Sequence, residues 1–157
     1  MALAGLVGAS VPAGFKIGAT GKRMQEYLGL PGPAAGFMEA RNVHRARAEF
    51  AFADLIKPGL ECELAVRLAH DLPPGNYTAE TVLPAVGELV AAMEIVENRY
   101  DDLKTLGTPT LIADQVYHRA AAVGQLGGVD WRALPMDGLR GRISVDGAVR
   151  DEGVSSD

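Results

Sequence analysis

The stretch Gly59-Leu60-Glu61-Cys62-Glu63-Leu64-Ala65-Val66-Arg67-Leu68 has the alternation of a β-strand, with an apolar side chain at every second position. Because strand side chains alternate between two faces, Glu61 and Glu63 lie on the same face. Two carboxylates this close repel one another, and a hard cation such as Mg²⁺, Mn²⁺ or Ca²⁺ relieves that repulsion. Taken alone, the strand fits the solvent-facing side of a half-buried sheet better than a metal site.

The composition indicates an ordinary globular domain. The chain has 157 residues, of which 48% are apolar and 22% charged, so it is long enough to bury a core in one domain. The 19 glycines and 9 prolines favour many turns and therefore a β-rich fold. A formal net charge of −5 gives no electrostatic reason to expect a nucleic-acid partner.

Cysteine usage and hydropathy indicate the compartment. The one cysteine rules out an internal disulfide and is typical of a reducing environment. No apolar run reaches the length of a membrane span. The first twelve residues lack the positive segment of a signal peptide, so we interpret them as part of the fold or as a trimmed start. We expect a cytoplasmic protein with no membrane partner.

The first third of the chain predicts a strand followed by a helix. Residues 13–20 alternate as a strand, with Lys16 flanked by two glycines. Thr20 is expected to cap a helix through Leu28, which Gly29 ends. The next basic side chains are interpreted as a solvated loop or edge strand rather than an anion site: Arg41, His44, Arg45 and Arg47.

The middle of the chain predicts a helical connection between two strands. Thr78 is expected to cap a helix with Val82, Val86 and Leu89 on one face, although Pro84 suggests a later start. Around residues 89–99 the apolar period changes to that of a buried strand.

Glu94 lies within this apolar run, on the face opposite Ile95. A carboxylate in such a place is costly unless it is paired with a cation. Glu94 is therefore more informative than Glu61 or Glu63 taken singly.

The last third predicts short elements. Residues 101–110 are expected to form a loop, followed by a helical turn around Asp114 and a strand from Arg119 to Val123. Residues 124–128 are interpreted as a flexible connection. The dipeptide Asp146-Gly147 between two apolar-alternating runs predicts a β-hairpin.

Four blocks in a fixed order resemble the fumarylacetoacetate hydrolase superfamily, in its 2-keto-4-pentenoate hydratase / 4-oxalocrotonate decarboxylase branch. Gly14-Phe15-Lys16-Ile17-Gly18, with Met24-Gln25-Glu26-Tyr27-Leu28-Gly29 after it, resembles a G-x-K-[IV]-G segment and its helix. Glu61-Cys62-Glu63-Leu64-Ala65 resembles an E-x-E-[IL]-A strand. Met93-Glu94-Ile95-Val96-Glu97-Asn98-Arg99 resembles L-E-[IV]-V-[DE]-S-R, and Ile112-Ala113-Asp114-Gln115 resembles V-A-D-N.

The resemblance implies an α+β fold, a β-rich mixed sheet or roll of the superfamily's C-terminal-domain type. It implies a site for Mg²⁺ or Mn²⁺ held by Glu61, Glu63 and Glu94. The implied substrates are small 2-oxo or 2-hydroxy-dienoic acids from aromatic-compound catabolism, and the implied reaction is hydration by a lyase. A homo-oligomer is expected.

The same resemblance implies roles for three polar side chains. Lys16 is the candidate general acid/base. Asp114 is a second catalytic candidate, which positions water or holds Lys16, and a capping aspartate in a turn is an equal alternative. Arg99 is expected to be a structural partner of an acid rather than a substrate clamp.

The chain also departs from the family pattern. Gln115 stands where the family has Asn, and Asn98 where it has Ser. Family members extend beyond both ends of this sequence, so residues 1–157 are expected to form one partial, incomplete domain. The alternatives are a related 2-oxo acid decarboxylase or C–C hydrolase, and, in another class, an inactive truncated remnant that acts only in subunit association.

Overall fold

The computed structural model describes residues 5, 11–125, 127 and 130–155. The expectation that residues 1–12 belong to the fold falls mostly on residues outside this set, as does part of the expected connection at 124–128. The chain divides into two compact units, of which unit 1 comprises Met1–Glu61 and Met93–Ala122 and unit 2 comprises Cys62–Ala92 and Val123–Asp157. Whether the chain is one domain stays a prediction. Within the described residues, no helix has both the length and the hydropathy to cross a lipid bilayer.

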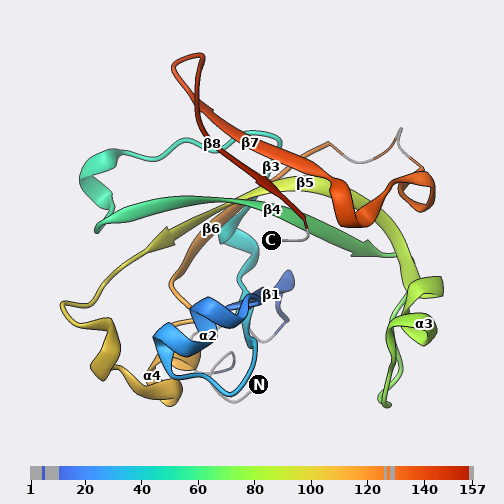
Figure 1. Cartoon of the computed structure of the whole chain (residues 1–157), viewed down its shortest axis with the longest axis horizontal. Coiled ribbons are helices and arrows are strands. Elements are labelled where there is room, and N and C mark those ends of the chain that lie inside the picture. Colours follow the sequence, from blue (N-terminus) through green and yellow to red (C-terminus); the bar gives the residue numbers. More distant parts are fainter. Residues whose placement is uncertain (1–4, 6–10, 126, 128–129, 156–157) are drawn as a thin grey trace. The chain divides into compact units, whose positions relative to one another are not determined.

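Strands dominate the described secondary structure, and the helices are short (Figure 1). The helices and strands are, in chain order, β1 (Gly14–Gly18), α2 (Lys22–Leu28), β2 (Ala34–Met38), β3 (Val43–Arg45), β4 (Pro58–Leu68), α3 (Ala79–Val82), β5 (Val86–Glu97), α4 (Gly107–Ala113), β6 (His118–Val123), β7 (Arg140–Val145) and β8 (Ala148–Val154). The expected β-rich α+β fold is confirmed.

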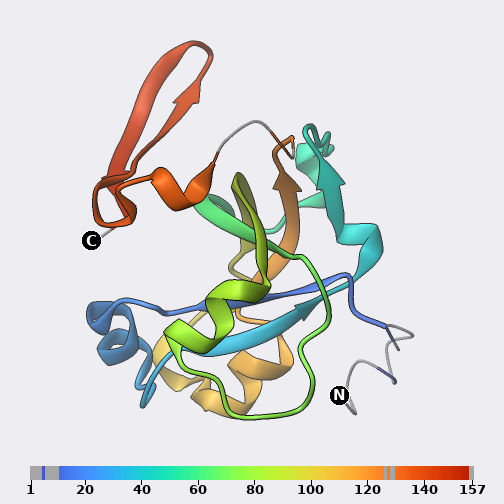
Figure 2. The ribbon, with the colours of Figure 1, turned by 90° about the vertical axis from the view of Figure 1, so that its right-hand side faces the viewer.

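In unit 1, β1 and β2 form an antiparallel pair in which Lys16 lies opposite Gly36. Figure 2 shows α4 (gold) beside this pair. A small apolar core packs between these elements, formed by Leu30, Ala34, Leu111 and Val116. The apolar side chains of β1 point outward, with Phe15 64% and Ile17 62% exposed, so the buried face of β1 is the one that carries Lys16.

Four strands form one sheet, in the order β3-β6-β5-β4. The carbonyl of Lys57 accepts from the N–H of Asn98, and the N–H of Ala69 donates to Ala85, which shows that β4 and β5 run antiparallel. The predicted strand at 59–68 is confirmed as β4. β3 is an edge strand, which confirms the interpretation of the basic stretch around it.

Several predicted boundaries are wrong. Helix α2 begins after Gly21 with no side-chain cap, so Thr20 is not its N-cap. Thr78 does cap α3, through a capping box with Thr81, but this helix ends at Val82 and Pro84 belongs to the 3-10 turn that follows.

Two further predictions place a boundary too late. Val86 and Leu89 are not on a helix face, because β5 already begins at Val86. The expected loop at 101–110 ends early, because α4 begins at Gly107.

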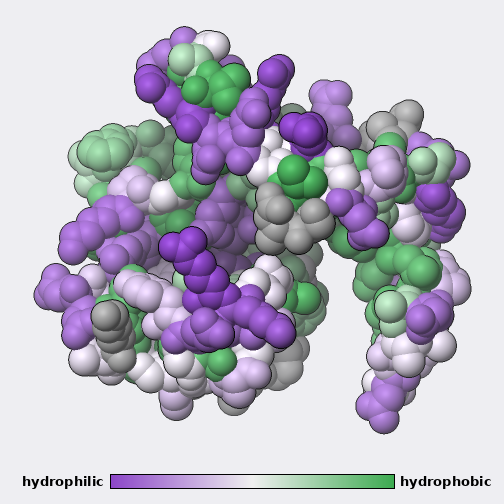
Figure 3. Space-filling view, in the orientation of Figure 1, coloured by the Kyte–Doolittle hydropathy of each residue, from purple (hydrophilic) through white to green (hydrophobic). Residues whose placement is uncertain are grey.

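In unit 2, β7 and β8 form the predicted hairpin around Asp146-Gly147. Both turn residues have positive φ, 52° and 79°, as the hairpin turn favoured by Asp-Gly requires. Figure 3 shows hydrophilic side chains over most of the hairpin tip, with a smaller hydrophobic group among them. Val145 and Val149 are exposed hydrophobic residues of this hairpin.

We predict that Gly36→Ala lowers the free energy of unfolding by about 1–3 kcal/mol, because overpacking a tight contact forces backbone shifts. A Cβ at Gly36 would lie 3.0 Å from Gln115 Cα and 3.1 Å from its carbonyl oxygen. Gly32→Ala is the control, since nothing lies within 4 Å of a Cβ there. Urea unfolding measures both variants, and equal midpoints would contradict the close approach of β2 to Gln115.

Candidate active site

The three carboxylates that the sequence singled out lie close together. Glu61 and Glu63 are next-but-one neighbours on β4, and Glu94 is on β5, the adjacent strand. One carboxylate oxygen from each lies within 4.8 Å of the others. Oxygen donors at this spacing form the donor set that hard divalent cations bind, so the residues present fit such an ion.

Glu94 is the buried member of the cluster, with its residue only 5% exposed. Its Oε1 lies 2.9 Å from Nζ of Lys16, and both side chains are at least nine-tenths buried. The same ammonium group donates to the carbonyl oxygen of Val116 at 3.0 Å. The structure therefore brings Lys16 to the carboxylates, and the pairing offsets the cost of burying Glu94.

His118 also contacts Glu94, and the sequence reasoning missed it. It is the first residue of β6, which lies beside β5 in the sheet. Its Nδ1 lies 2.7 Å from Glu94 Oε1, and its side chain is 3% exposed. The sequence offers one signal, a lone histidine at the start of an apolar strand, and only the pairing of β5 with β6 reveals its partner.

The pKa of Glu61 is raised above its ordinary value of 4.5. Desolvation of its carboxyl group is the largest cause, and the negative charge of Glu94 adds to it, while Lys16 opposes both. The cluster thus holds negative charge that Lys16 alone does not fully offset.

Asp114 lies at the C-terminal end of α4 and pairs with Arg99 rather than with Lys16. Nη1 of Arg99 donates to both carboxylate oxygens of Asp114, at 3.0 and 3.1 Å. Nη2 of Arg99 donates to Glu97 Oε2 at 3.1 Å and to the carbonyl oxygen of His118 at 2.9 Å. Arg99 is therefore the structural partner of acids that the sequence predicted, and the expectation that Asp114 holds Lys16 is wrong.

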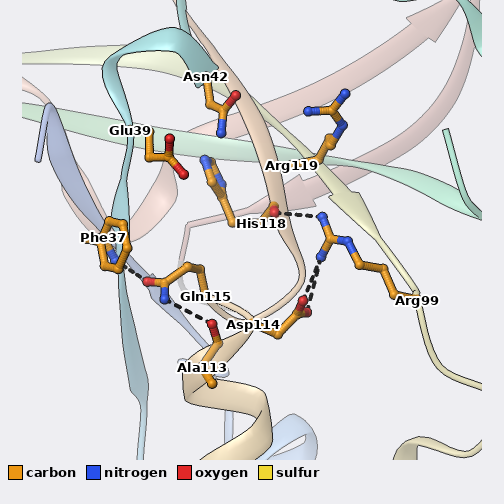
Figure 4. A pocket seen from close by; sticks show the side chains of 9 residues that line it. All are labelled: Phe37, Glu39, Asn42, Arg99, Ala113, Asp114, Gln115, His118 and Arg119. Atoms are coloured by element: carbon orange, nitrogen blue, oxygen red, sulfur yellow. Dashed lines mark hydrogen bonds and ion pairs between the residues drawn. The ribbon is translucent and has the colours of Figure 1, made fainter. Parts of the chain in front are cut away.

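A pocket of about 250 Å³ lies beside these groups in unit 1 (Figure 4). Its lining is mostly polar and comprises Phe37, Glu39, Asn42, Arg99, Ala113, Asp114, Gln115, His118 and Arg119. Gln115 joins it to β2, because its Oε1 accepts from the N–H of Phe37 at 2.6 Å. The pocket presents both hydrogen-bond acceptors and donors, including the carboxylate of Asp114 and the guanidinium of Arg119.

The chain resembles hydratases and a decarboxylase in sequence, while no family model matches it. It is 34% identical over 89 residues to 2-keto-4-pentenoate hydratase of Burkholderia vietnamiensis, which covers 57% of this chain and 34% of the relative. It is 36% identical over 93 residues to 2-hydroxyhexa-2,4-dienoate hydratase of Comamonas testosteroni, covering 58% and 35%. It is 30% identical over 111 residues to 4-oxalocrotonate decarboxylase of a Pseudomonas species, covering 71% and 43%.

The fold also matches a solved structure. The TM-score is 0.79 to 4-oxalocrotonate decarboxylase from Pseudomonas putida G7 complexed with magnesium and adipate, at 19% identity, over 92% of this chain and 54% of that one. The chain thus spans about a third to a half of the curated relatives it matches and about half of the solved one. Its homologues are 2-keto-4-pentenoate hydratases and 4-oxalocrotonate decarboxylase, which confirms the resemblance carried by its four blocks.

We predict that, with divalent cations removed, Glu61→Gln gains stability relative to the wild type as the pH rises. Folded Glu61 holds its proton to a higher pH than unfolded Glu61, whose pKa is 4.5. The wild type therefore loses stability as the pH rises from 4.5 through the folded pKa, and an uncharged Gln does not.

Urea unfolding at about pH 4 and about pH 7 measures this difference. Glu26→Gln, an exposed change in α2, is the control. A wild-type-minus-variant difference that is the same at both pH values would contradict the raised pKa.

Proposed function

We propose that the chain carries the cation-binding and proton-handling groups of a hydro-lyase acting on small 2-oxo or 2-hydroxy-dienoic acids. The observation that carries the proposal is the buried Lys16–Glu94 pair, at 2.9 Å, beside two further glutamates on the adjacent strand. The homologues support the reaction class, because several are named as hydratases of such acids.

Glu61, Glu63 and Glu94 would hold the cation. The solved relative of the same fold was obtained with magnesium and, in a second structure, with calcium, which supports a divalent ion here. When bound, a divalent ion supplies Lewis-acid stabilisation of negative charge on a substrate oxygen. The proposed ion is Mg²⁺ or Mn²⁺.

Lys16 is proposed as the group that holds and moves a proton. Its Nζ is fixed by Glu94 and by the carbonyl of Val116, so the ammonium has a set position and a third hydrogen available for a substrate atom. Hydration of a dienoic acid needs a proton delivered to carbon and a water oriented at the alkene. Asp114, which lines the pocket and is held by Arg99, is proposed to orient that water.

A decarboxylase of the same family is the second candidate. One curated relative is named 4-oxalocrotonate decarboxylase, and the solved structure of the same fold is also a 4-oxalocrotonate decarboxylase. The C–C hydrolase and the inactive remnant are less well supported, since curated relatives are named as hydratases and a decarboxylase and Lys16 lies against Glu94. A cytoplasmic location, a homo-oligomeric state and the absence of nucleic-acid or membrane partners stay predictions.

The cation site is tested by isothermal titration of Mg²⁺. We expect the wild type to bind, and Glu61→Gln and Glu94→Gln each to lower the affinity at least about tenfold, because each removes a charged ligand. Glu88→Gln is the matched control, a glutamate on the same strand as Glu94 that pairs with Arg67 instead. Absence of binding by the wild type, or an equal loss in the control, would refute the site.

Catalysis is tested by following the absorbance of 2-hydroxypenta-2,4-dienoate with Mg²⁺ present. We expect turnover, and a fall of about 10²–10⁴-fold in Lys16→Met with Mg²⁺ binding retained, because general acid/base groups contribute that much. Lys22→Met, an exposed change in α2, is the control. Release of CO₂ from 4-oxalocrotonate without hydration of the dienoate would favour the decarboxylase, and binding of Mg²⁺ with no turnover of either acid would favour the inert module.

A further inference from the structure

His118 stands out because its ring has a single hydrogen bond. Nδ1 contacts Glu94 Oε1, whereas Nε2 is buried and has no hydrogen-bond partner among the residues that the structure describes. A buried polar atom without a partner is costly and calls for a compensating role of the residue. The contact that can supply this compensation is the one between Nδ1 and the carboxylate of Glu94.

The direction of this hydrogen bond is fixed by chemistry. An ionised carboxylate has no proton to donate, so the proton of the contact belongs to Nδ1 of His118. Lys16 Nζ donates to the same oxygen at 2.9 Å. Two donors within hydrogen-bond distance therefore converge on Oε1 of Glu94 and use its two lone pairs.

The remaining oxygen of Glu94 is then the one with lone pairs left for a cation. A carboxylate restricted in this way binds through one oxygen rather than through both. Mg²⁺ demands near-ideal octahedral geometry with short bonds, whereas Ca²⁺ takes more ligands in looser geometry and accepts bidentate carboxylates. One-oxygen binding at Glu94 favours the smaller ion.

The backbone of His118 is also held by a hydrogen bond. Its carbonyl oxygen accepts from Arg99, which is itself clamped by the two oxygens of Asp114. A connected series of contacts thus runs from Asp114 through Arg99 and His118 to Glu94. Partners behind a metal ligand commonly fix its orientation in this manner.

We propose that His118 is a positioning residue that holds Glu94 in one-oxygen binding and so sets the preference of the site for Mg²⁺ over Ca²⁺. This inference rests on the cation site of the proposed function. It adds His118 to the three carboxylates of that site. It also adds ion selectivity, which follows because Lys16 and His118 both donate to Oε1 of Glu94.

The test measures Mg²⁺ and Ca²⁺ affinities by isothermal titration for the wild type and two variants. His118→Phe keeps a planar ring and removes the donor. We expect the Mg²⁺ affinity to fall about tenfold, as is typical when the partner of a metal ligand is lost, and the Ca²⁺ affinity to fall less, so that the ratio of the two falls. His118→Asn keeps an N–H donor near the place of Nδ1 and should retain the wild-type ratio within about twofold. His44→Phe, on β3 and against Phe50, is the matched histidine control.

The outcomes separate this inference from the proposed function. If the wild type binds neither ion, the cation site fails and the inference with it. If the wild type binds and His118→Phe weakens both ions equally, or neither, the positioning role is overturned while the cation site stands.

A measurement on the wild type covers the case in which His118→Phe does not fold. Imidazole ¹⁵N–¹H correlation spectra should show the proton of His118 on Nδ1 both before and after Mg²⁺ is added. A proton that leaves Nδ1 when Mg²⁺ binds would overturn the proposal.

Discussion

The ion pair between Lys16 and Glu94 is the interaction on which the site depends. A lone buried carboxylate would take up a proton or force the strand open, because isolated ions are strongly disfavoured away from water. Lys16 prevents this, and it reaches Glu94 only because β1 turns its apolar side chains outward and its cation inward. The exposure of Phe15 and Ile17 is unusual for apolar side chains on a strand. It follows because the opposite face of β1 places Lys16 against Glu94.

A backbone feature brings the third element into place. Gln115, Val116 and Tyr117 have positive φ values of 57°, 55° and 64°, a conformation that L-residues, and β-branched Val above all, adopt at a cost of about 1–3 kcal/mol each. The contacts of the same segment offset that cost: the Val116 carbonyl receives Lys16, and the Gln115 side chain receives the N–H of Phe37. This tight left-handed turn ends α4 and starts β6 with His118 facing Glu94.

Local patterns predicted the parts of the molecule that local physics determines. The alternation around Glu61 and Glu63 predicted β4, the apolar run around Glu94 predicted β5, and Asp146-Gly147 predicted the hairpin. Pairings across the fold could not be predicted in this way: His118 meets Glu94 because β6 lies beside β5, and Asp114 goes to Arg99 because α4 ends where it does. Thr20 failed as a cap because Gly21 takes that position, which propensity alone does not decide.

The spacing of these contacts along the chain has a consequence for folding. His118 and Glu94 are 24 residues apart, whereas the contact of Lys16 with Val116 spans 100 residues. Closing the longer loop costs more chain entropy, by about 1 kcal/mol, so the contact of β1 is the more expensive of the two to form. Without β1, Glu94 would contact His118 but would lack the cation that balances its negative charge. The contacts of Lys16 with Val116 and Glu94 therefore join β1 to the segments that carry β5 and β6, so this ion pair links distant parts of the same unit.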